Sequence, residues 1–233
     1  MRTLIILAAL GGVAHANSDN ENLDSVGAVA NKGQELVGIT AGTRAGDGGG
    51  FVLGTSDWNS TTGLKLTGGA EIPVWHHLRA VLRVEDFAGN GRPGAGLAYV
   101  LTPYATAYML YKAEGFSEPE GEIEGALALA HGPLAGSLTF GQDADAKNRD
   151  VEGAVAARFA VADRIYAGAM ARYRDALGTT GEALARDSFG GAVATLVVDR
   201  VAISALAGVA GVQKVGQDFK VGPAATLAIG AAF

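Results

Sequence analysis

The last thirteen residues of the chain, 221–233, alternate between two kinds of side chain. One parity holds all the bulky apolar groups and ends on an aromatic residue, and the other holds only Gly, Ala and Thr. The first set is Val221, Pro223, Ala225, Leu227, Ile229, Ala231 and Phe233. A period of two predicts a β-strand with one apolar face. About ten such residues, tilted, cross a bilayer, so this stretch predicts a membrane-spanning strand.

A strand of this kind that ends on Phe233 resembles the C-terminal strand of Gram-negative outer-membrane β-barrels, including the porins. The resemblance implies that Phe233 is part of the assembly signal read by the barrel-assembly machinery. It also implies a multi-pass β-barrel in the cell outer membrane, in contact with outer-membrane lipids and lipopolysaccharide. The resemblance is to an architecture rather than to one sequence family, so it predicts fold and location better than activity.

The first residues predict export. Arg2 precedes an apolar run at residues 4–13, and an Ala-His-Ala sequence follows. A charged start, a short apolar core and an A-x-A site predict a cleaved secretory signal peptide over residues 1–16. The run is shorter than the ~18 residues of a transmembrane helix, which argues against a membrane anchor. Residues 17–32 are polar, and we expect a helix or a disordered lead-in there.

The alternation recurs through residues 33–233 and predicts an all-β fold. We expect a single closed antiparallel transmembrane β-barrel of about twelve strands, within a range of about 10–14, with short periplasmic turns and longer outer loops. The first strand is expected from Gly33, and a loop is expected at 45–61. The short turns are expected near residues 75, 103, 132, 163 and 199, and longer connections at 45–61, 88–93, 115–119, 142–150, 175–186 and 213–220.

Composition narrows the possible partners and cross-links. The chain has no cysteine, so disulfides do not hold it together, whereas a closed barrel pairs every backbone group around its ring. The net charge is −6 and the chain has no basic cluster, which argues against a nucleic-acid partner. A soluble β-sandwich also alternates, but here one face stays apolar across many strands.

Two motifs resemble ligand sites, and neither is expected to bind a cofactor or a metal. Residues 89–94 (GNGRPG) match G-x-G-x-x-G, but a dinucleotide site needs a following helix, and a strand is expected here. The acidic loop contains Asp143, Asp145 and Asp150, but Lys147 stands where an EF-hand needs an oxygen ligand. A weak surface cation site in that loop is the alternative.

The histidines argue against catalysis. His76, His77 and His131 lie in or beside short turns that we expect on the periplasmic side. Outer-membrane barrel hydrolases resemble one another in placing a His with Ser or an acid near the outer face, and a nucleophile needs a base within hydrogen-bond reach. We therefore expect no catalytic residues and no enzyme activity. An outer-membrane lipid or peptide hydrolase is the least favoured alternative.

Charged side chains occupy the face opposite the apolar one. Twelve of them are expected to line the barrel lumen: Lys65, Glu71, Arg79, Arg83, Glu85, Lys112, Glu122, Glu124, Glu152, Arg158, Arg172 and Arg174. Seven of the twelve are basic and five are acidic, which predicts at most a weak preference for anions. Strand 201–212 is apolar on both faces, and its orientation is left open.

Hairpin geometry also predicts which lumen charges lie opposite one another. The expected pairs are Glu71 with Arg79, Lys65 with Glu85, Lys112 with Glu124, and Glu152 with Arg174. Arg83 is expected opposite Thr67, which leaves it as an unpaired cation. These pairs would hold the side chains against the wall of an open channel, or would meet across the centre and close it.

The function predicted from these features is a narrow porin-like channel for passive diffusion of small solutes. The alternative is a closed structural or surface-interaction barrel without pore activity.

Overall fold

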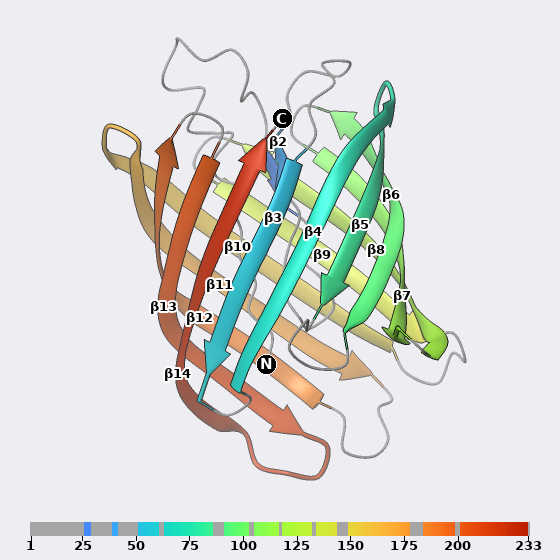
Figure 1. Ribbon diagram of the computed structural model, residues 1–233. Helices are drawn as coiled ribbons and strands as arrows, with labels where there is room; N and C mark the ends of the chain where they lie inside the picture. Colours follow the sequence, from blue (N-terminus) through green and yellow to red (C-terminus); the bar gives the residue numbers. More distant parts are fainter. Residues whose placement is uncertain are drawn as a thin grey trace.

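Twelve antiparallel strands close into one barrel in the computed structural model (Figure 1). The structure describes residues 26–28, 39–41, 51–60, 63–85, 91–102, 105–116, 118–131, 134–143, 149–177, 184–198 and 201–232. The wall strands are β3 (Phe51–Asn59), β4 (Gly63–Trp75), β5 (Leu78–Glu85), β6 (Arg92–Thr102), β7 (Ala105–Gly115), β8 (Glu118–His131), β9 (Leu134–Asp143), β10 (Arg149–Ala162), β11 (Ile165–Leu177), β12 (Leu184–Val198), β13 (Val201–Lys214) and β14 (Lys220–Ala232). The described residues contain no helix long and apolar enough to cross a membrane.

Each wall strand pairs with its neighbours in sequence, and the last pairs with the first. The closing contact joins β14 to β3, with Ala232 opposite Phe51 and Ala224 opposite Asn59. Closure leaves no sheet edge, so the backbone donors and acceptors of the wall are paired without water or disulfides. The expected barrel of about twelve strands is confirmed.

The side chains that alternate in the sequence point alternately into the barrel and away from it. In β14, Leu227 and Ile229 are 47% and 50% exposed, whereas Ala228 between them is 0% exposed. The same rule orients β13, where Ser204 and Leu206 are buried and Ile203 and Val209 are exposed. Large apolar side chains are exposed around the outer surface, which is the arrangement that a lipid-facing wall requires.

The first wall strand lies where the sequence predicted a loop. Residues 45–61 were expected to connect strands, but β3 occupies most of this stretch, and residues 42–50 lie outside the described part. The stretch is rich in Gly, Ser, Asp and Asn, which favours turns in isolation. Closure of the ring overrides this preference because β14 and β4 supply hydrogen-bond partners on both sides.

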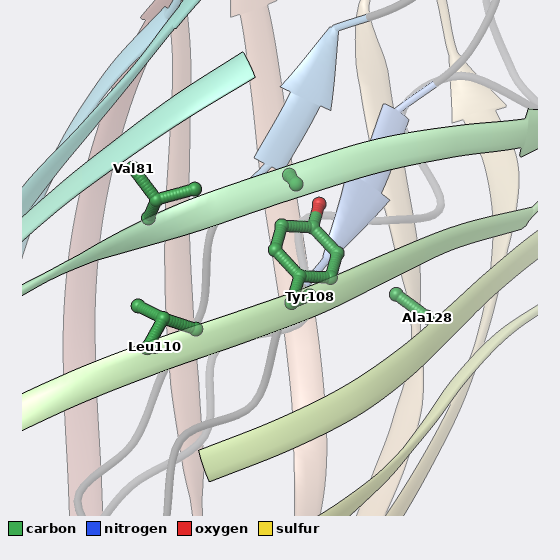
Figure 2. Packing of buried hydrophobic residues seen from close by; sticks show 5 residues of the cluster. Val81, Tyr108, Leu110 and Ala128 are labelled. Atoms are coloured by element: carbon green, nitrogen blue, oxygen red, sulfur yellow. The ribbon is translucent and has the colours of Figure 1, made fainter. Parts of the chain in front are cut away.

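The described part of the strand expected from Gly33 is not part of the wall. Of that stretch the structure describes β2 (Ile39–Ala41), which pairs with β1 (Val26–Ala28) as a separate two-stranded sheet. β1 lies beside β8 and β9, and β2 lies beside β3. β3 and β9 are six positions apart in the twelve-strand ring, on opposite walls. The β1–β2 sheet therefore extends across the barrel interior (Figures 1 and 2).

The short turns fall at the predicted places, on the end of the barrel that holds the C-terminus. Consecutive strands are separated there by two residues each: 76–77, 103–104, 132–133, 163–164 and 199–200. His76 and Arg164 adopt positive φ angles of 41° and 61° in two of these turns. At the opposite end, the loop expected at 115–119 is shorter than predicted, because Gly115 already pairs with Glu118.

Several strands have a register shift next to a turn. Each shift changes which residues lie opposite one another but keeps the same residues pointing into the barrel. A three-residue turn was expected at 162–164, whereas the structure has a two-residue turn, Ala162 pairing with Ile165. A register shift between Ala160 and Ala162 compensates, so Glu152 still lies opposite Arg174 as predicted. One extra residue in a strand reverses the parity that the shorter turn would impose.

Candidate functional site: the barrel interior

The predicted lumen charges lie on the inner face of the wall. Eleven of the twelve are buried, and Lys65 is half-buried. They come from strands β4, β5, β7, β8, β10 and β11, on which inward positions alternate with outward apolar ones. The period-two pattern therefore brings charges that are far apart in sequence into one enclosed space. Their partners in that space decide what the interior can bind.

One group of charges, the Lys112 cluster, surrounds a single ammonium with three carboxylates. The Lys112 Nζ lies 2.7 Å from Glu124 Oε2, 3.0 Å from Glu122 Oε1 and 3.6 Å from Glu85 Oε1. Arg83 Nη1 lies 3.7 Å from the same Glu85 oxygen. Lys112, Glu85 and Glu124 are 0% exposed. Buried carboxylates stay charged only when paired, so the ammonium holds this side of the wall together.

A second group, the Arg172 cluster, joins three neighbouring strands. Arg172 on β11 contacts Asp187 on β12, Nη2 to Oδ2 at 2.7 Å, and Glu152 on β10, Nη1 to Oε2 at 3.8 Å. Arg174 donates a hydrogen bond from Nε to Asp150 Oδ2. Each guanidinium thus has a carboxylate partner on an adjacent strand.

The observed pairs correct several of those predicted. Glu71 and Arg79 form the predicted ion pair, with 3.7 Å between Oε2 and Nη1. They are diagonal neighbours rather than directly opposite, because Glu71 lies opposite Val81. Lys112 lies opposite Glu122 and reaches Glu124 from there. The paired positions of β4 and β5 are offset by two residues from the prediction, so the facing is the same and the partners differ.

Two of the predicted positions for basic residues are wrong. Lys65 lies opposite Asp57 rather than Glu85. Arg83 lies opposite Gly69 rather than Thr67, and its ion pair with Glu85 means that it is not an unpaired cation. The two-residue offset between β4 and β5 explains why neither residue has its predicted partner on the neighbouring strand, whereas Arg83 and Glu85 lie on the same strand.

The sequence reasoning missed three inward carboxylates. Asp57, Asp150 and Asp187 are at most 1% exposed. Asp57 and Asp150 lay in stretches assigned to loops, and Asp187 lies close to the end of β12. Their parity with Thr55, Glu152 and Phe189 was the available signal. The buried charges described by the structure comprise six basic and eight acidic residues, which reverses the predicted excess of basic groups.

Apolar side chains fill another part of the inner face. Val81, Ala98, Tyr108, Leu110 and Ala128 form a buried cluster on β5–β8 (Figure 2). These residues share the inward parity of the charges on the same strands. The interior is therefore divided between charged clusters and an apolar surface, and this limits the space open to water.

Arg158 differs from the other buried basic residues. It is 0% exposed, and its Nη1 donates a hydrogen bond to Thr195 Oγ1 at 2.7 Å. The Thr195 hydroxyl lies 2.8 Å from the Ser204 hydroxyl. Within the described residues, no carboxylate forms an ion pair with Arg158.

The histidines and the two sequence motifs that resemble ligand sites lie mainly in turns or near the ends of strands. His76 and His77 form the turn after β4, and His131 ends β8. Residues 92–94 of the glycine motif belong to β6 rather than to a helix. Asp143 ends β9, Asp150 belongs to the Arg172 cluster, and Asp145 lies outside the described residues. No three His, Cys, Asp or Glu side chains of the described part could together hold a metal ion.

The fold of the chain resembles that of solved porin structures, although no similarity in sequence was found. No protein-family model matches the chain, and no curated protein matches it in sequence. Among solved structures, the NanC porin is similar with a TM-score of 0.53 and 8% identity, over 77% of this chain and 98% of that chain. The KdgM porin is similar with a TM-score of 0.52 and 10% identity, over 78% of this chain and 99% of that chain. The chain thus shares the barrel fold of these two porins.

Proposed function

We propose that the protein is a narrow channel of the outer membrane for passive diffusion of small solutes. The observation that carries this proposal is the sorting of side chains by the closed wall, with large apolar groups outside and buried charges inside. A wall that faces lipid on one side and water on the other requires this sorting. The shared fold with two porins supports the proposal.

The charge arrangement predicts low ion selectivity for the channel as a whole. In the described part of the chain, six basic and eight acidic residues are buried, and most are joined in the Lys112 and Arg172 clusters and the Glu71–Arg79 pair. Charges paired along the wall create little net field at the channel axis. We therefore propose low selectivity between anions and cations in place of the weak anion preference expected from sequence.

A second candidate is a closed structural barrel, and one observation favours it. The β1–β2 sheet extends across the interior between β3 and the β8–β9 wall. Inward side chains such as Glu85 and Arg158 are 0% exposed. In such a barrel the outer loops would bind partners and the lumen would conduct nothing. We propose no enzyme activity for either candidate.

Conductance separates the two candidates. Purified full-length protein added to planar bilayers should produce discrete current steps smaller than those of wide aqueous porins, because a twelve-strand barrel is narrower. Heat-denatured protein from the same preparation is the control for detergent effects. Absence of steps from protein that migrates as a folded barrel on unheated gels would reject the channel and leave the closed barrel.

We also propose that the chain is inserted by the barrel-assembly machinery into a membrane of phospholipid and lipopolysaccharide. Phe233 lies outside the described residues, directly after β14. Deletion of Phe233 should lower the amount of protein in the outer membrane, while Phe233→Tyr, which keeps an aromatic end, should not. Quantitative immunoblots of outer-membrane fractions measure this. Equal amounts of all three proteins would contradict the assignment.

A further inference from the structure

Arg158 is a buried cation with an incomplete set of partners. It lies in the last third of β10, near the end of the barrel that holds the C-terminus. Its Nη1 is held by Thr195, which in turn contacts Ser204. Its Nε and Nη2 have no hydrogen-bond partner, and no described carboxylate forms an ion pair with it. An uncompensated buried charge is costly, so an anion bound at this edge would stabilise the charge.

The geometry of the guanidinium indicates which chemical class of anion it would bind. Nε and Nη2 share one edge of the planar group, and their N–H bonds point the same way. This edge matches two oxygens of one carboxylate or phosphate, which accept two parallel hydrogen bonds. Since Nη1 is anchored on Thr195, the edge that stays unpaired is the one suited to bidentate binding.

The inward positions next to Arg158 on the wall carry small side chains or none. Gly168, directly opposite Arg158 on β11, has no side chain, and Ala156 precedes Arg158 on the same inward face. The Thr195 and Ser204 hydroxyls add polar groups from β12 and β13. In the Arg172 cluster, by contrast, each guanidinium is paired with a carboxylate of the wall.

We propose that Arg158, with Thr195 and Ser204, forms a binding site for the oxyanion group, a carboxylate or phosphate, of a small solute inside the barrel. The role of this site in permeation rests on the proposed channel function, whereas binding itself does not. Apart from Arg158, the buried charges of the described residues are five basic and eight acidic, so the site is a local attraction for anions rather than a filter for the whole channel.

Calorimetric titration of the folded full-length protein in detergent tests binding, with sodium acetate and inorganic phosphate as probes and sodium chloride as reference. Acetate or phosphate should bind in preference to chloride, and Arg158→Gln should weaken that binding about tenfold or more, as expected for loss of a charged bidentate contact. Arg158→Lys keeps the charge without the planar edge and should lose most of the preference over chloride. Arg164→Gln, in an exposed turn, is the matched control and should bind as the unaltered protein does.

The variants are compared only after heat-modifiable gel migration shows that each is folded. Unchanged acetate and phosphate binding in folded Arg158→Gln would overturn the site. Equal binding by Arg158→Lys would overturn the bidentate geometry.

Bilayer currents separate this proposal from the channel itself. Acetate or phosphate should reduce the current carried by chloride through the unaltered protein, and this block should disappear in Arg158→Gln. Current steps without any such block would reject the site and retain the channel. Specific binding without current steps would support the site and reject the channel.

Discussion

Deletion of residues 17–50 should raise single-channel conductance several-fold. The segment includes β1 and β2, which extend across the interior between β3 and the opposite wall. The wall itself begins at Phe51 and closes on β14 without them. Removal therefore leaves the ring intact and takes backbone out of the path that ions would follow. Conductance in planar bilayers, measured for folded protein with and without the segment, gives the comparison.

Deletion of residues 17–25, which precede β1, is the matched control. It shortens the chain at the same end and retains the β1–β2 sheet, so its conductance should stay close to that of the full-length protein. Equal currents from the full-length protein and the 17–50 deletion would show that the sheet does not obstruct the channel. No current from either protein, with folded barrels, would favour the closed structural barrel.

Lys112→Met should destabilise the barrel more than any other single change proposed above. The substitution removes an ammonium that lies within 3.6 Å of three carboxylates while roughly preserving side-chain volume. Glu85 and Glu124 are 0% exposed, so the carboxylates lose their partner without gaining water. Removing one partner of a buried ion pair costs about 3–5 kcal/mol. Urea unfolding in lipid vesicles, followed by the fluorescence of outward-facing Trp58 and Trp75, measures the loss.

Two further variants test the cause of this loss. Lys214→Met removes an exposed lysine at the end of β13 and should change the free energy of unfolding by less than about 0.5 kcal/mol. Lys112→Met combined with Glu124→Gln removes one of the unpaired charges and should recover part of the stability. A single Lys112→Met variant as stable as the unaltered protein would mean that water already solvates the cluster.

The course of the first strand shows why sequence reasoning failed locally. Residues 51–59 contain Gly, Ser, Asp and Asn, which favour turns. The alternation that would indicate a strand, with Leu53 and Thr55 on one face and Val52 on the other, is weak by comparison. The strand exists because β14 and β4 pair with it on both sides. Asp57 was missed for the same reason, since an inward position is recognisable only after the strand has been recognised.

The partners of the lumen charges depended on turns and register shifts. Arg83 was expected opposite Thr67 and unpaired. A register offset of two residues places it opposite Gly69, and its ion pair at 3.7 Å is with Glu85, two residues further along the same strand. Glu152 was correctly placed opposite Arg174, although its carboxylate also forms an ion pair with Arg172. Long side chains reach diagonal neighbours, so opposite position alone does not name the partner.

The local pattern of the chain specifies which side of the wall each residue of a recognised strand faces, because side chains alternate with every residue and one face must meet lipid. It therefore identified the twelve-strand barrel, the positions of the short turns and the inward parity of residues such as Lys112 and Arg158. Ring closure, register shifts and the position of the β1–β2 sheet depend on contacts between distant segments. Those contacts set the ion pairs, left the Arg158 edge unpaired and brought strands across the interior, which no local period can specify.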